Sequence, residues 1–364
     1  MWKKEFEIKR GVLVRYNGEA KEIVLPEKVK AIGEKVFCGN INICSITFPK
    51  RLKTIGKEAF RDCASLTWIT LPEGLTTIGE GAFCGCCDLV SASVPDSVTT
   101  IGKDCFANCY NLKEITLPKN LTFLGASAFA NCAEITEMAF PSGLTAIPDS
   151  VFYGCDALQK VTLPDGITSI GKDAFYFCKK LENVTLPESL LTIGERAFDD
   201  CISITEVNLP PNLQSIGLGA FGCTGISQIT IPESVTCLEG VAFCNCKKLK
   251  KFSLPKSITT IPFDTFALCE SLEEAVVPEH IIAIGDNAFM MCRSLSAIEI
   301  PENVTSVGEK AFSFCDKLEK IRFSANVTEF GKDVFNRCSP IICAPAGSAA
   351  ERYAKENGLV FEAI

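Results

Sequence analysis

The stretch CYNLKEITLPKNLTFLGASAFANC, from Cys109 to Cys132, decides the fold. Within it, Ile115 and Leu117 alternate with polar residues, which is the period-2 pattern of a β-strand with one buried face. Pro118 follows directly, and because proline has no backbone N–H it cannot extend a hydrogen-bonded ladder. The stretch is therefore expected to begin with a short strand that ends at a proline corner.

The second half of this stretch predicts a bend and then a turn of helix. Leu121 and Leu124 return to the interior, and Gly125 indicates a tight bend. Ala128 and Cys132 are four residues apart, so a single helical turn would place both on one face. Each unit is expected to contain a strand, a corner, a second short extended piece and a helical turn.

The same pattern recurs along nearly the whole chain, in two columns that keep step at intervals of about 23 residues. One column holds Pro26, Pro49, Pro72, Pro95, Pro118, Pro141, Pro164, Pro187, Pro210, Pro232, Pro255, Pro278 and Pro301. The other holds Phe37, Phe60, Phe83, Phe106, Phe129, Phe152, Phe175, Phe198, Phe221, Phe243, Phe266, Phe289, Phe312 and Phe335. One residue is missing from the repeat, between Phe221 and Cys223 by this alignment. A glycine column is interrupted at Pro148, Glu239 and Pro262.

A unit of this size cannot bury its apolar edge alone, so the copies must stack on one another. The sequence therefore predicts an α/β repeat solenoid of about fourteen turns. A parallel β-sheet is expected on one face, with short extended segments and helical turns on the others.

Both ends of the chain carry patterns that differ from the repeat. Residues 1–21 are expected to form an N-terminal hairpin cap, because two apolar segments flank Arg10-Gly11. Residues 344–364 are expected to form a C-terminal helix-strand cap, because Ser348 and Glu351 have capping-box spacing and Gly358 is a suitable helix stop. The solenoid itself is assigned to residues 22–343.

Composition narrows the classes of partner. The mean hydropathy is +0.22, yet no apolar run approaches the roughly 18 to 20 residues of a membrane span, so membrane insertion is not expected. A net charge of -8 with scattered Lys and Arg argues against nucleic acid. The first residues lack an apolar signal region, which predicts a cytoplasmic location, or a cell-surface or secreted one if a leader was removed.

The cysteines form a further column. Its members are Cys63, Cys86, Cys109, Cys132, Cys155, Cys178, Cys201, Cys223, Cys246, Cys269, Cys292, Cys315 and Cys338. Neighbours in such a stack are about 4.8 Å apart and point in parallel, which is unfavourable for disulfides. A ladder of buried thiols acting as small hydrophobes and weak donors is predicted, in a reducing or anaerobic setting. The alternative is a zinc cluster of Cys84, Cys86, Cys87, Cys105 and Cys109, with Cys244 and Cys246 as a weaker pair.

The sequence marks out no catalytic constellation. His280 is the only histidine and is expected in an exposed corner, so a Ser-His-Asp or Cys-His mechanism would have to depend on it. A catalytic pair of carboxylates stays an open alternative, because a sequence does not show which acidic side chains converge in the fold. We expect no enzyme activity, no cofactor and no metal.

The running pattern Cys-x-x-Leu-x-x-Ile-x-Leu-Pro-x-x-Leu-x-x-Ile-Gly-x-x-Ala-Phe-x-x-Cys resembles the BspA-like leucine-rich-repeat family of bacteria and some protists. The resemblance extends from about Gly18 to Cys343, and both ends look like those of such proteins from gut Firmicutes. It implies a leucine-rich-repeat fold. Surface members of the family are adhesins that bind host matrix proteins, and they carry export signals and anchors that this sequence does not show.

The outward positions of the predicted strands are the candidate binding surface. The residue type four positions before each proline varies from turn to turn, whereas the buried positions are uniform. Such variation is expected of a surface that a partner contacts, and it is also expected of random drift at solvent-exposed positions. The candidate residues are Trp68, Glu114, Glu137, Lys160, Asn183 and Glu206. Trp68 would be an interface anchor or would pack on neighbouring strands. The leading hypothesis is a non-enzymatic scaffold that binds a polar or somewhat basic protein on this face, and the alternative is a BspA-like adhesin ectodomain.

Overall fold

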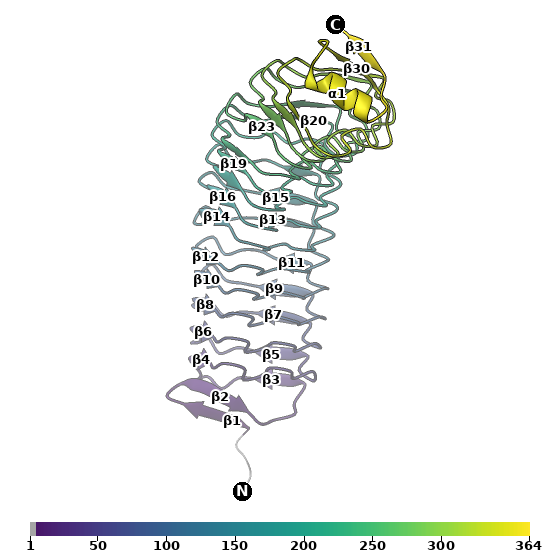
Figure 1. The fold of residues 1–364 in the computed structure, drawn as a ribbon. Helices are drawn as coiled ribbons and strands as arrows, with labels where there is room; N and C mark the ends of the chain where they lie inside the picture. The colour runs from purple at the N-terminus through teal and green to yellow at the C-terminus, as the bar shows by residue number, and fades with distance from the viewer. Residues whose placement is uncertain (1–4) are drawn as a thin grey trace. The chain divides into compact units, whose positions relative to one another are not determined.

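The structure, a computed structural model, describes residues 5–364. The chain forms two compact units, Met1–Pro187 and Glu188–Ile364. In each unit successive turns of the chain stack, with short parallel strands on two sides (Figure 1). Residues 1–4 of the predicted N-terminal cap lie outside the described residues.

The strands that precede the proline corners, here called the pre-proline strands, pair in parallel with a register offset of one repeat. Trp68, for example, pairs with Ser91. In the first unit these strands are β3 (Glu22–Val24), β5 (Ser45–Thr47), β7 (Trp68–Thr70), β9 (Ser91–Ser93), β11 (Glu114–Ile115), β13 (Glu137–Ala139), β15 (Lys160–Thr162) and β17 (Asn183–Val184). In the second they are β20 (Gln228–Thr230), β22 (Lys251–Ser253), β24 (Glu274–Val276), β26 (Ala297–Glu299), β28 (Lys320–Arg322) and β30 (Ile341–Ala344). Parallel strands on one face are confirmed, but they form separate ladders and not one sheet: β3–β5, β7–β9–β11 and β13–β15–β17 in the first unit, and β20–β22 and β24–β26–β28–β30 in the second.

A second set of two-residue strands, the pre-glycine strands, lies after each corner and directly before the glycine column. In the first unit these are β4 (Ala31–Ile32), β6 (Thr54–Ile55), β8 (Thr77–Ile78), β10 (Thr100–Ile101), β12 (Phe123–Leu124), β14 (Ala146–Ile147) and β16 (Ser169–Ile170). In the second they are β18 (Thr192–Ile193), β19 (Ser215–Ile216), β21 (Cys237–Leu238), β23 (Thr260–Ile261), β25 (Ala283–Ile284), β27 (Ser306–Val307) and β29 (Glu329–Phe330). The predicted second extended piece therefore also forms parallel ladders.

The predicted helical turn is not confirmed. The segment from Ser127 to Cys132 forms two consecutive turns, in which Ala130 N–H donates to the Ser127 carbonyl and Cys132 N–H to the Phe129 carbonyl. Ser127 and Asn131 have φ angles of 56° and 59°, and such left-handed residues break an α-helix. Other amides, including that of Phe129, donate to carbonyls of the next turn, so this phenylalanine segment also stacks by backbone hydrogen bonds.

The core of each unit is a stack of phenylalanine rings beside a ladder of thiols. In the first unit, adjacent rings from Phe37 to Phe175 have centroids 4.9 to 5.9 Å apart and nearly parallel planes. The Cys132 thiol donates to the Phe106 carbonyl at 3.1 Å, and Cys155 does the same to Phe129. The expected role of the thiols as buried weak donors is thus observed, and all 21 cysteines are free.

The glycine column lies where neighbouring turns approach closely, in keeping with the tight bend expected from the sequence. Gly56, Gly79 and Gly102 do not have positive φ angles. A Cβ atom on Gly79 would instead lie 2.7 Å from the backbone carbon of Gly56, because neighbouring turns approach closely at this column. Glycine is therefore selected by the space between turns and not by conformational freedom.

Two prolines in this column interrupt the pre-glycine ladders. Gly125 N–H donates to the Ile101 carbonyl at 2.9 Å, but Pro148 has no amide to donate to the turn before it. One ladder accordingly ends at β12 and the next begins at β14. In the second unit a ladder ends at β21, and another begins at β23, which directly precedes Pro262.

The ends of the chain cover the aromatic stack. β1 (Phe6–Lys9) and β2 (Val12–Tyr16) form an antiparallel hairpin, and the Tyr16 ring lies 5.2 Å from that of Phe37. At the other end, α1 (Ala349–Glu356) is followed by β31 (Phe361–Ala363), which pairs with β30. The Tyr353 hydroxyl accepts a hydrogen bond from Val334 N–H at 3.0 Å. The assignment of residues 1–21 and 344–364 as separate caps stays a prediction.

Burial of the thiols predicts a sharp difference in cysteine reactivity. Burial raises the pKa of Cys63 and of Cys246 to about 12, so their thiols stay protonated at pH 8. Cys38 and Cys237 are exposed. Titration of the native protein with a chromogenic disulfide reagent should label these two first and the ladder only after urea is added. Rapid native labelling of all 21 thiols would contradict the buried ladder.

Candidate functional site

The predicted binding residues of the first unit lie on the exposed face of the pre-proline strands. Trp68 is 56% exposed at the start of β7. Glu114, Glu137, Lys160 and Asn183 are also exposed, each as the first residue of its strand. The structure therefore places these five side chains in one outward column, and their role in partner binding stays a prediction.

Glu206 is placed differently. It lies in the second unit and is exposed, but residues 201–210 form no strand. The strand expected there from the repeat is absent from the described chain. The sequence pattern thus predicted the exposure of Glu206 correctly and its strand incorrectly.

Two cavities open on the face of the first unit. One of about 240 Å³ is lined by residues of β11, β13 and β15, including Ile115, Met138 and Lys160. The other, of about 560 Å³, is lined by Lys160 and Asn183 on β15 and β17, together with flanking residues. Lys160 and Thr162 belong to both, so β15 separates two depressions on this face.

The second unit contains an irregular turn, where the predicted position of the missing residue is wrong. Thr224, not Cys223, follows Phe221 at the spacing of the thiol ladder, and its side chain is 2% exposed. The Thr224 hydroxyl donates to the Phe221 carbonyl at 2.8 Å and lies 3.2 Å from the Cys246 sulfur. The missing residue therefore lies between Thr224 and the buried Ile226. Cys223 is displaced from the ladder, with a φ angle of 56°.

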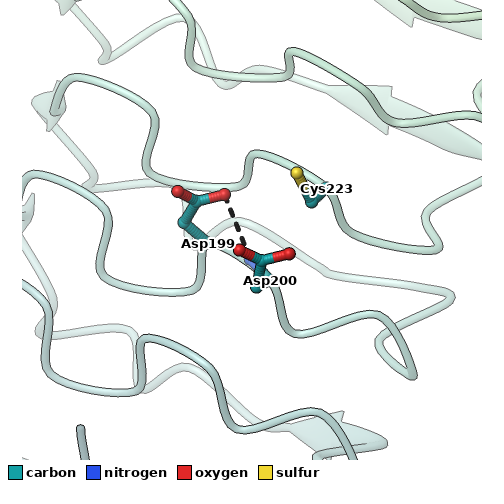
Figure 2. A group of neighbouring side chains, drawn as sticks. All are labelled: Asp199, Asp200 and Cys223. Atoms are coloured by element: carbon teal, nitrogen blue, oxygen red, sulfur yellow. Dashed lines mark hydrogen bonds between the residues drawn. The ribbon is translucent and has the colours of Figure 1, made fainter. Parts of the chain in front are cut away.

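Displacement of Cys223 brings it to two carboxylates. Single ligand atoms of Asp199, Asp200 and Cys223 all lie within 4.8 Å of one another (Figure 2). The Asp200 amide donates to the Asp199 carboxylate at 3.0 Å, and the Asn245 side chain donates to the Cys223 sulfur at 3.2 Å. Gly222 leaves room for this group, because a Cβ atom there would lie 2.6 Å from an Asp199 oxygen.

Burial shifts the proton affinities of this group. It raises the pKa of Asp199 from 3.8 to about 6, aided by the charge of Asp200 and opposed by hydrogen bonds from the Asp200 amide and the Cys223 thiol. Burial likewise raises the pKa of Cys223 to about 11. At neutral pH the thiol is therefore protonated, and the three residues form a hydrogen-bonded cluster.

Among the described residues, Asp199, Asp200 and Cys223 form the group whose ligand atoms lie close enough together to hold a metal ion. A thiolate with two carboxylates is a donor set compatible with a borderline cation such as zinc, which would have to displace the thiol proton. The cysteine spacing instead suggested Cys84 and its neighbours as zinc ligands, but the Cys86 and Cys109 thiols donate to the carbonyls of Phe60 and Phe83. The adjacent acids at 199 and 200 were the available sequence signal, whereas the position of Cys223 required the corrected register.

The raised pKa of Asp199 predicts that stability falls as pH rises. The folded state holds the proton of Asp199 more tightly than the unfolded state, so between about pH 4 and pH 6 its contribution decreases by about 1–2 kcal/mol, allowing for solvent screening. Asp199→Asn should flatten the pH dependence of the unfolding free energy over this range, measured by urea unfolding at a series of pH values. The exposed Asp165→Asn is the matched control, and an unchanged slope in Asp199→Asn would contradict the prediction.

His280 is half-buried and not fully exposed as expected, and its Nε2 atom is buried without a hydrogen-bond partner.

No helix among residues 5–364 has the length and apolar character to span a membrane. Non-enzymatic action stays a prediction.

Comparisons with known proteins agree with the geometry. The family pattern described as "BspA type Leucine rich repeat region" matches in six copies, over residues 14–136, 124–248 and 216–342. No curated protein matches the chain. A leucine-rich repeat protein from Bacteroides ovatus is 28% identical, with 99% of this chain and 97% of that chain covered and a TM-score of 0.87.

A leucine rich cell surface protein from Faecalibacterium prausnitzii is 26% identical, with 88% of this chain and 90% of that chain covered and a TM-score of 0.55. A leucine-rich repeat protein from Eubacterium ventriosum, 19% identical with a TM-score of 0.57, shares the fold, with 90% of each chain covered. With stacked parallel strands, a repeated sequence pattern and a family match over most of its length, the chain belongs to the BspA type leucine-rich-repeat family.

Proposed function

We propose that the protein is a non-enzymatic interaction scaffold that binds a protein partner on the pre-proline face of its first unit. The observation that carries the proposal is the pair of cavities of about 240 and 560 Å³ that share Lys160 and Thr162. Depressions with apolar floors and charged rims are typical of surfaces that seat side chains of a partner. Membership of a repeat family whose folds present extended surfaces supports the same function.

The charges around these cavities indicate the chemistry of the partner. Glu114 and Glu137 are adjacent in the outward column, and Lys160 follows them. A partner surface with polar and somewhat basic groups would match the first two, with an acceptor opposite Lys160. Trp68, 56% exposed on β7, supplies a large apolar area suited to an anchoring contact.

A second candidate function is that of a cell-surface adhesin ectodomain. It is favoured by the similarity to the Faecalibacterium prausnitzii protein, which is described as a cell surface protein. The same face would then bind an extracellular protein. Protease treatment of intact cells distinguishes the two, since only a surface-located protein is cleaved without lysis, and cytoplasmic protection would exclude adhesion.

Site-directed photo-crosslinking tests the scaffold function. With p-benzoylphenylalanine in place of Asn183, illumination of native cells should give one dominant adduct with a second protein. Lys160→Glu and Trp68→Ala should each reduce it at least about fivefold, which corresponds to about 1 kcal/mol of lost affinity. Lys103→Glu is the matched control, because it makes the same charge change on the phenylalanine segment. An adduct equally strong in all variants would contradict binding on this face.

A further inference from the structure

The pre-proline sheet of the first unit is divided in the middle of the candidate face. β11 pairs with β9, and β13 pairs with β15, but within residues 5–364 no backbone hydrogen bond joins β11 to β13. In the preceding turns Val90 N–H donates to Thr67 and Lys113 N–H to Val90, whereas the next such bond, from Thr136 to Lys113, is not formed among these residues. Figure 1 shows a wider interval between β11 and β13 than between β9 and β11.

The division continues on the other side of the same two turns. β12 and β14 belong to separate ladders, because Pro148 cannot donate to the turn that contains β12. The turns stay joined at the phenylalanine segment, where Phe129 N–H donates to the Val151 carbonyl at 3.0 Å. The turns also approach at the corner after the prolines, where a Cβ atom on Gly143 would lie 2.6 Å from the Leu121 carbonyl oxygen. The result is an opening at the pre-proline strands that is bounded by close backbone approaches before and after it.

The opening leaves two strand edges unpaired above a largely buried apolar floor. The cavity of about 240 Å³ lies here, and Leu117 and Met138 line it. Ile115 is half-buried, whereas its equivalents Ile69 and Val161 are 2% and 4% exposed. Strand edges with free N–H and C=O groups are templates for pairing with another chain.

We propose that this opening binds an extended peptide segment of the partner, which adds a strand between β11 and β13. The inference rests on the proposed scaffold function and specifies its ligand. Backbone hydrogen bonds to both edges would supply affinity, and alternate side chains would supply specificity. Inward residues of the peptide must be apolar, to cover Ile115 and Met138, and outward residues must be basic, because Glu114 and Glu137 flank the opening.

The test is fluorescence anisotropy of the full-length protein with a fluorescein-labelled acetyl-KVKVKV-amide peptide. We expect saturable binding, and at least about tenfold weaker binding when the valine amides are N-methylated, because this removes donors and keeps the side chains. Pro148→Gly restores the missing amide and should close the opening, weakening binding at least about tenfold. Pro262→Gly makes the same change in the second unit and should leave the affinity unchanged.

A second set of variants keeps the inference testable if Pro148→Gly does not fold. Glu114→Gln combined with Glu137→Gln should weaken peptide binding, and Glu274→Gln in the equivalent column of the second unit should not. Equal binding of the N-methylated peptide, or no binding of either peptide, overturns the inserted strand. If the Asn183 adduct still depends on Lys160 in that case, the scaffold function stands and only the inserted strand is wrong. If the peptide binds as expected but no adduct forms, the scaffold proposal fails instead.

Discussion

A Phe129→Ala variant is expected to lose about 3–5 kcal/mol of unfolding free energy, the cost of truncating a fully buried aromatic side chain. Phe129 is 0% exposed and stacks between Phe106 and Phe152, with centroids 5.6 Å away on both sides. Removal of the ring leaves a cavity that the flanking rings cannot close, because backbone hydrogen bonds fix the spacing of the turns. Urea unfolding followed by circular dichroism measures the loss.

Phe123→Ala is the matched control for this experiment. Phe123 belongs to the same turn but is 53% exposed, so its truncation should change the unfolding free energy by no more than about 0.5 kcal/mol. Because stability in a repeat array is carried by neighbouring interfaces, the Phe129 variant should also lower the cooperativity of its unit. Equal losses in the two variants would show that the aromatic stack does not stabilise the fold.

The phenylalanine and cysteine columns could be predicted from the sequence because stacking gives each column a single environment. A residue such as Phe129 meets its own equivalents above and below, so periodicity alone identifies it as buried. The same reasoning assigned Cys132 to the interior, where its thiol donates to the Phe106 carbonyl.

The helical turn could not be distinguished by spacing. A four-residue interval between inward residues fits a helix and also fits two successive turns with left-handed residues. In the first four turns the residues two after the phenylalanines carried the missing signal, since Gly39, Asp62, Gly85 and Asn108 are types that tolerate positive φ. Later turns hide it, because residues such as Phe177 and Leu268 have a positive φ at the same position. The backbone amides of the four residues in the first turns donate hydrogen bonds to the next turn. In an α-helix the same amides would donate to carbonyls of their own segment instead.

The exposure of the candidate site residues could be predicted from the sequence, but the cavities and the opening between strands could not. The outward column from Trp68 to Asn183 follows from alternation. The interruption between β12 and β14 follows from the amide that Pro148 lacks, whereas the separation of β11 from β13 beside Glu137 is visible only once the turns are stacked. Cys223 was assigned to the ladder by its identity, whereas Thr224 occupies the ladder position.

A Gly79→Ala variant is expected to destabilise the first unit by about 1–3 kcal/mol or more, although only one methyl group is added. The new Cβ atom would lie 2.7 Å from the carbon of Gly56 and 2.8 Å from the nitrogen of Lys57, and backbone atoms cannot rotate away as a flexible side chain can. The turns must therefore move apart at β6 and β8, which breaks the 2.8 Å hydrogen bond from Gly79 N–H to the Ile55 carbonyl.

Gly39→Ala separates this steric effect from the conformational freedom of glycine. Gly39 has a φ angle of 73° and no atom within 4 Å of an added Cβ, so its substitution costs only the left-handed backbone penalty of about 1–2 kcal/mol. Thermal unfolding and amide hydrogen exchange should show local loss of protection at Ile55 and Ile78 in Gly79→Ala alone. If both variants lost the same stability without that local change, glycine in the column would serve backbone flexibility, and the close approach of the turns would not be what selects it.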